Sequence, residues 1–179
     1  MAILTTDILR KFSVKTGAAG NSTAGNAAGS LGKYISTTQI TDNSLNNLFD
    51  DVTGDENAAS AVEYRCIFFH NAHASLTYTA PYVWLSAEVS GGTTVAIGID
   101  GIAASVIGDS NAQAGEVANE NTAPSGVSFS SPTSKATGLA LGDIPAGYCR
   151  AIWVRRTAAN TPAINNDGAT IQIDGDTAA

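Results

Sequence analysis

The sequence is short of basic residues, of cysteines and of long hydrophobic runs, and each shortage excludes a class of protein. Nine Lys and Arg stand against sixteen Asp and Glu, so the net charge is −7. Phosphate binding needs clustered Lys and Arg, so we expect no nucleic-acid partner. Two cysteines are too few for a disulfide scaffold. No apolar run approaches the roughly 20 residues that a bilayer-crossing helix needs, so we expect no membrane partner.

The N-terminus also lacks the pattern of a secretory signal. Residues 1–12, MAILTTDILRKF, place their apolar residues before the basic ones, whereas a signal peptide has the opposite order. We therefore expect the product to be made in the cytoplasm, where both thiols stay reduced.

What the sequence does contain is a set of apolar segments of strand character. Residues 63–71 (EYRCIFFHN) form the densest apolar run, and aromatic and β-branched side chains are typical of a pleated strand. Both faces of this run are apolar beyond Arg65, which predicts a strand covered on both sides for most of its length. Residues 82–87 and 148–156 have the same character. We expect these three strands to form the centre of one sandwich.

From residue 58 onward, short strands alternate with turn signals. The run 93–100 (TTVAIGID) alternates as a half-buried strand does, and 165–168 (NNDG) indicates a hairpin turn. Residues 100–126 are polar and irregular, and we expect them to be long connections. Seven or eight strands without a helix of standard length predict an all-β fold. We expect an antiparallel β-sandwich, immunoglobulin-like or jelly-roll, over residues 58–179.

Residues 1–57 differ from the rest and predict an extended N-terminal arm. We expect a short amphipathic helix within residues 3–12, a flexible Gly- and Ala-rich segment at 17–32, and a helical turn at 42–51. The arm would become ordered against a neighbouring subunit, because a solvated tail has no use for large apolar side chains. An ordinary tail is the alternative. The residues predicted to contact the partner are Phe12, Leu31, Tyr34, Ile35 and Ile40.

Cys66, Trp84 and Cys149 invite a comparison with immunoglobulin domains, in which two cysteines and a tryptophan from three strands meet in the core. The spacing is looser here, and the tyrosine two residues before the second cysteine is absent. Two alternatives stay open for the cysteines. Either both are buried free thiols, which a reducing cytoplasm favours, or they form a disulfide later.

The residues show no catalytic or metal-binding constellation. His70 and His73 (HNAH) have no further ligand nearby in sequence to complete a zinc site, so we expect structural roles for them. Glu116 and Glu120 lie in a polar loop without an apolar wall that would raise a pKa for acid catalysis. The acidic turns lack EF-hand spacing and leave only weak calcium binding open. We expect neither an enzyme nor a cofactor.

Five stretches carry a resemblance to a known class of proteins. They are SLGKYISTTQI (30–40), NNLFDDVTGDENAASAVEYRCIFFHN (46–71), VANENTAP (117–124), LGDIPAGYCRAIWVRRT (141–157) and NNDGATIQIDGDTAA (165–179). These stretches are spread along residues 30–179, and they resemble small virion structural proteins of tailed bacteriophages. Such proteins are usually immunoglobulin-like or jelly-roll domains that decorate and cement the capsid, or parts of the tail and baseplate.

The resemblance implies an assembly role without an active site. Our leading hypothesis is a capsid decoration or cement protein, made in the host cytoplasm and located on the outer capsid surface. Its partners would be the major capsid protein and further copies of itself in a symmetric oligomer. The alternative is a tail or baseplate module that binds a host-surface glycan through an exposed aromatic platform. Tyr78, Tyr82 and Trp84 are the candidates for that platform, although the alternation in YVWL favours a core position for Trp84.

Overall fold

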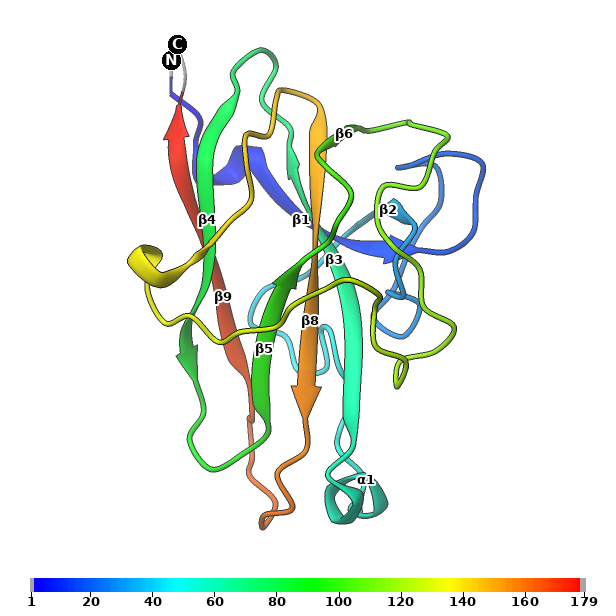
Figure 1. The fold of residues 1–179 in the computed structure, drawn as a ribbon, viewed down its shortest axis with the longest axis vertical. Coiled ribbons are helices and arrows are strands. Elements are labelled where there is room, and N and C mark those ends of the chain that lie inside the picture. The colour runs from blue at the N-terminus through cyan, green and yellow to red at the C-terminus, as the bar shows by residue number, and fades with distance from the viewer. Residues whose placement is uncertain (1, 178–179) are drawn as a thin grey trace.

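The computed structural model describes residues 2–177, and strands make up most of its regular structure (Figure 1). The strands are β1 (Ile8–Val14), β2 (Tyr34–Gln39), β3 (Val62–Asn71), β4 (Tyr78–Glu88), β5 (Thr94–Ile99), β6 (Ser105–Val106), β7 (Leu139–Ala140), β8 (Tyr148–Thr157) and β9 (Ala169–Thr177). The helical elements are the 3₁₀ turns η1 (Thr5–Asp7) and η2 (Lys135–Thr137) and the short helix α1 (Gly54–Ala59).

Two antiparallel sheets pack against each other. The large sheet has the order β2-β1-β3-β8-β5, with β6 also paired to β8, and the small sheet has the order β7-β4-β9. The all-β antiparallel sandwich predicted from the sequence is therefore confirmed. The core between the sheets consists of Ile8, Phe12, Ile40, Ile67, Phe69, Tyr78, Val83, Leu85, Val95, Ile97, Leu141, Ile144, Ile152 and Val154.

A second core covers the other face of the large sheet. Alternate side chains of β3 and β8 point away from the small sheet. They are buried beneath two long connections, the one between β1 and β2 and the one after β5. This second core contains Ile35, Cys66, Phe68, Ala114, Val117, Cys149, Ala151 and Trp153. The central strand β3 is thus buried on both faces from Arg65 to Asn71, as its apolar composition predicted. Figure 1 shows the connection after β5 crossing the sheet and folding back beside β3.

The predicted N-terminal arm is wrong. Strand β1 lies inside the large sheet between β2 and β3, and Phe12 stands opposite Ile67 of β3. The helix expected within residues 3–12 is also wrong, because only the single turn η1 precedes β1. Ile8 and Phe12 are four residues apart, a spacing that fits both a strand and a helix. The segment forms a strand because it can pair with the edge of β3. The sandwich therefore begins at β1, and the predicted boundary between 57 and 58 falls inside it.

The Gly- and Ala-rich segment 17–32 is held against the sheet rather than free. The amide of Asn21 donates to the Ile35 carbonyl at 2.6 Å, and the amide of Cys66 donates to the Ser30 carbonyl at 2.7 Å. Small residues allow this close approach, since a Cβ on Gly20 would overlap the side-chain amide of Gln113. Composition alone predicted flexibility because the partner surface, the outer face of the large sheet, is formed by distant residues.

The segment 42–51 forms turns rather than the predicted helical turn, and the only α-helix in residues 2–177 follows it. Helix α1 begins after Thr53, whose hydroxyl accepts from the amide of Glu56 at 3.3 Å. The Glu56 carboxylate accepts in return from the amide of Thr53 at 2.7 Å. This reciprocal cap is typical of the sequence Thr-x-x-Glu, so the start of the helix could have been predicted from residues 53–56.

Candidate functional site

The residues predicted to bind a partner are packed inside their own chain. Phe12 and Ile40 lie in the core between the sheets, and Ile35 lies in the second core. Tyr34 is buried as well, and Leu31 packs against the second core. Four of these side chains are buried and not free to enter a subunit interface, so the prediction is wrong for Phe12, Tyr34, Ile35 and Ile40. Leu31 is only partly buried, and for it the interface stays a prediction. The four buried residues were correctly identified as needing burial, but the surface that buries them belongs to the same molecule.

Cys66 and Cys149 are buried free thiols on neighbouring strands of one sheet. Cys66 stands opposite Trp153, whereas Cys149 stands opposite His70, four rows along the same pair of strands. Four rows separate the two by about 13 Å, whereas a disulfide needs Cα atoms within about 7 Å. The disulfide alternative and the immunoglobulin arrangement are therefore wrong. Burial raises the pKa of Cys149 to about 12, so its thiol is a poor nucleophile.

His70 lies in the same buried face and has an unusual environment. Its side chain is 6% exposed, and neither ring nitrogen has a hydrogen-bond partner. Lys11 on the adjacent strand is also buried, and its Nζ donates to Oδ1 of Asn21 at 2.8 Å. Burial, with a smaller contribution from the Lys11 charge, lowers the pKa of His70 to about 4. The imidazole is therefore neutral at pH 7.

His73 and the two glutamates of the polar loop have structural partners. Nδ1 of His73 accepts from the amides of Ser75 and Leu76 at 3.1 and 3.0 Å, which fixes the turn before β4. Glu116 lies 3.8–3.9 Å from the ammonium groups of two lysines, Lys15 and Lys33. Glu120 pairs with the buried guanidinium of Arg65. Within residues 2–177, no three His, Cys, Asp or Glu side chains come together to hold a metal ion.

A buried ionic cluster closes the sandwich near α1. Nε of Arg156 donates to Glu63 at 2.7 Å, and the same guanidinium contacts Asp50. Phe49 packs under two guanidinium groups, with Cζ of Arg156 4.8 Å and Cζ of Arg65 5.4 Å from its ring centroid. These cation–π contacts tie the 42–53 segment to the large sheet.

Two further buried polar side chains, Asp100 and Gln113, hold the long connection after β5. The Asp100 carboxylate accepts from Nε1 of Trp153 at 2.8 Å and from the amide of Gly115 at 2.9 Å. Gln113 accepts from the amide of Ile35 at 3.0 Å and donates to the Val106 carbonyl at 2.9 Å. Sequence reasoning missed both residues, because an Asp or Gln in a polar stretch gives no signal that it is buried.

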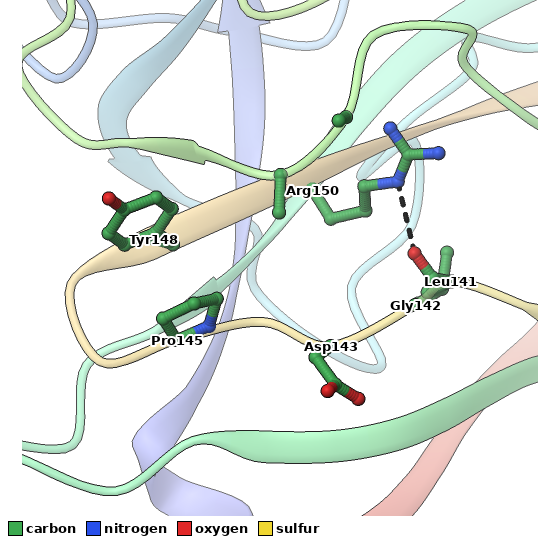
Figure 2. Close-up of a pocket in the computed structure, with 8 residues that line it drawn as sticks. Leu141, Gly142, Asp143, Pro145, Tyr148 and Arg150 are labelled. Atoms are coloured by element: carbon green, nitrogen blue, oxygen red, sulfur yellow. Dashed lines mark hydrogen bonds between the residues drawn. The ribbon is translucent and has the colours of Figure 1, made fainter.

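One shallow cavity of about 360 Å³ opens at an end of the sandwich (Figure 2). Tyr148 and Pro145 lie at one end of it, and Arg150 lies at the other. Nε of Arg150 donates to the Leu141 carbonyl at 3.2 Å, whereas its buried Nη1 has no partner. The Asp143 carboxylate accepts from the amide of Ala80 at 2.8 Å. The cavity therefore offers an aromatic ring, one guanidinium and one carboxylate to a small ligand.

The sheet edges differ in how they are covered. Residues 21–23 cover β2, where the amide of Thr37 donates to the Thr23 carbonyl at 2.9 Å. Ser130 covers β5 through reciprocal bonds with Ile97 of 2.8 and 3.0 Å. The side of β4 opposite β9 is covered by β7 and by segments around 132 and 144. Among residues 2–177, no backbone partner covers the outer edge of β9.

Comparison with known proteins gives this chain no relative. No family model and no curated protein matches the sequence, and no solved structure matches the fold. In the part of the chain that the structure describes, no helix is long and apolar enough to cross a membrane.

Proposed function

We propose that this protein is a virion structural protein of a tailed bacteriophage, a decoration or cement protein that binds the outer face of the assembled capsid. Its partner is the major capsid protein, and it acts as a symmetric oligomer without a cofactor. The proposal rests on the resemblance of five stretches spread along residues 30–179 and on one structural observation.

That observation concerns what the two long connections cover. The segments 17–32 and 100–130 bury the outer face of the large sheet instead of surrounding a binding cleft. Asp100 and Ser13 fix them by accepting from the amides of Gly115 and Gly32. Gln113 fixes the second segment by accepting from the amide of Ile35 in β2. A body with loops fixed in advance loses little conformational entropy when it docks on a lattice. This construction supports a contact function more than a chemical one.

The strands β1 and β2 belong to the large sheet, so residues 8–39 do not form the attachment arm that we predicted. The capsid-binding surface must therefore be part of the folded body. Its acidic balance, with a net charge of −7, favours a partner surface that carries Lys and Arg.

Cryo-electron microscopy of the virion tests this proposal directly. We expect density for the sandwich at repeated positions on the capsid lattice, and co-sedimentation of the purified protein with particles that lack it. Density confined to the tail tip would overturn the capsid assignment. A particle without this chain would overturn the virion assignment altogether.

A second candidate function is a tail or baseplate module that binds glycan. Of the three residues predicted to form an exposed platform, Tyr78 and Trp84 are buried and only Tyr82 is partly exposed. The cavity of Figure 2 favours this function instead, because Tyr148 presents a ring beside Pro145 and a guanidinium. A glycan array tests it, with Tyr148→Ala as the matched loss-of-binding variant. Binding that survives this substitution would exclude the cavity as the site.

A further inference from the structure

The outer edge of β9 is a long strand edge with no backbone-to-backbone partner among residues 2–177. The one contact at its end is the Ile3 amide, which donates to the Thr177 hydroxyl at 3.2 Å. We call the outward edge of Ala169–Thr177 the open edge. In Figure 1 the upper half of β9 forms the left margin of the molecule. An uncovered edge exposes backbone N–H and C=O groups that can pair with another strand, and natural proteins usually cover or blunt such edges.

The side chains of β9 do not blunt the open edge. Ile171 and Ile173 face the core between the sheets but remain only partly buried there. A neighbouring strand would cover them further. The charges of β9 lie on its exposed face and only in its C-terminal half, at Asp174 and Asp176. The N-terminal half carries the uncharged Thr170.

We propose that the open edge pairs with the open edge of a second copy of this chain, antiparallel about a two-fold axis at Ile173. In this register Gln172 stands opposite Asp174 of the second copy, and Thr170 stands opposite Asp176 of the second copy. Each pair places a hydrogen-bond donor beside a carboxylate, and each occurs twice because of the symmetry.

The charge pattern of the strand favours this occupant. No carboxylate faces another in this register, whereas a parallel pairing of two copies in register would stack Asp174 and Asp176 on themselves. Nζ of Lys135 lies 2.7 Å from Oδ2 of Asp174, so this carboxylate already has a counter-charge. On the inner face Ile173 meets its own copy, which continues the apolar core across the axis. The two small sheets join into one.

This inference deepens the proposed function, since it identifies the contact that would join copies in the symmetric oligomer. The biological role of the dimer rests on the proposed function, whereas the pairing itself does not. The test uses the free full-length protein. The dimer can therefore fail while particle binding succeeds, and particle binding can fail while the dimer forms.

Sedimentation equilibrium of the full-length protein and three variants tests the pairing. The wild type should dimerise at concentrations below roughly 1 mM. Gln172→Glu puts a carboxylate opposite Asp174 at two places and should raise the dimer Kd about tenfold. Adding Asp174→Asn to Gln172→Glu removes the facing carboxylate, places an amide donor opposite the new carboxylate at two places and should restore the wild-type Kd. Gln39→Glu makes the same change on the covered edge strand β2 and should leave the Kd unchanged.

Three sedimentation results would overturn the proposal. They are a wild type that stays monomeric, a Gln172→Glu variant that dimerises as the wild type does, and a double variant that stays as weak as Gln172→Glu. Circular dichroism establishes that each variant is folded. If Gln172→Glu does not fold, Thr170→Glu serves in its place, because it faces Asp176 of the second copy. Amide exchange in β9 gives an independent readout, since pairing should slow it as protein concentration rises, and no dependence on concentration contradicts the dimer.

Discussion

Buried polar side chains decide how the connections of this sandwich lie on its large sheet. Asp100 is 3% exposed, and one of its carboxylate oxygens accepts from both Trp153 and Gly115. Two donors in a buried site would lose their acceptor if this side chain were removed, and an unsatisfied buried donor is costly. The arrangement is therefore sensitive to single substitutions that leave the apolar core untouched.

We predict that Asp100→Ala lowers the free energy of unfolding by about 2–4 kcal/mol, because it leaves the Trp153 Nε1–H and the Gly115 amide without a partner. Asp109→Ala is the matched control, since the Asp109 carboxylate accepts only exposed bonds from Asn111. It should cost less than about 1 kcal/mol. Urea unfolding measures both. Equal losses for the two variants would show that Asp100 does not anchor the connection.

His70 predicts a dependence of stability on pH. Its pKa is about 4 in the folded protein and 6.5 in an unfolded chain, so the unfolded chain binds more protons between these values. Stability from this group is complete above pH 6.5 and is lost as the pH falls toward 4. Lys11 from β1 and Cys149 from β8 lie on the same face. Burial raises the pKa of Cys149 to about 12, far above this range, and Lys11 is present in both the wild type and the His70→Asn variant.

We expect the wild type to lose about 2 kcal/mol more than His70→Asn between pH 7 and pH 4, since the variant has no imidazole to protonate. Urea unfolding of both proteins at several pH values gives this difference, and carboxylates titrating in both proteins cancel from it. Parallel curves for the two proteins would place the ring of His70 in contact with water.

At the scale of the elements, a strand could be predicted from the sequence where its own side chains are enough to indicate a strand. The apolar runs of β3 and β8 need burial on two faces, and this need is independent of topology. Strand β1 could not be separated from a helix, because the decision depends on the edge of β3, more than 50 residues away. The position of β9 at a sheet edge could not be predicted from the sequence either, because it depends on the order of the strands in the sheet. The assignment of Phe12, Tyr34, Ile35 and Ile40 to an interface was wrong for the same reason.

The place of β1 in the sheet gives a direct test. Phe12 is 9% exposed and packs in the core between the sheets, so Phe12→Ala should lower the free energy of unfolding by about 3–4 kcal/mol. Leu4→Ala is the control, because Leu4 lies just before β1 and is 62% exposed. It should cost less than about 0.5 kcal/mol. Urea unfolding of the two variants measures both losses of unfolding free energy. If Phe12→Ala is as mild as Leu4→Ala, the N-terminal segment is a separate arm after all.

For the whole molecule, the consequence of these contacts is that sheet and connections form one cooperative unit. The amide of Gln113 donates to the Lys33 carbonyl at 2.7 Å, and the amide of Val117 donates to the Leu31 carbonyl at 3.1 Å. The two long connections are thus bonded to each other above the sheet. Neither can leave without exposing the second core beneath, which contains Phe68 and Trp153. Irregular backbone is usually the most mobile part of a protein, and here it should not be.

We therefore predict that the amides of Asn21, Gln113 and Val117 exchange with solvent as slowly as those of β3, because all of them open only when the whole sandwich unfolds. Native-state hydrogen exchange at low urea concentrations measures the opening free energy of each amide. The exposed turn at 165–167 is the internal reference and should exchange within the dead time. If the connections open several kcal/mol below β3, they are mobile loops on a stable sheet. The rigid docking body on which the proposed function depends would then be lost.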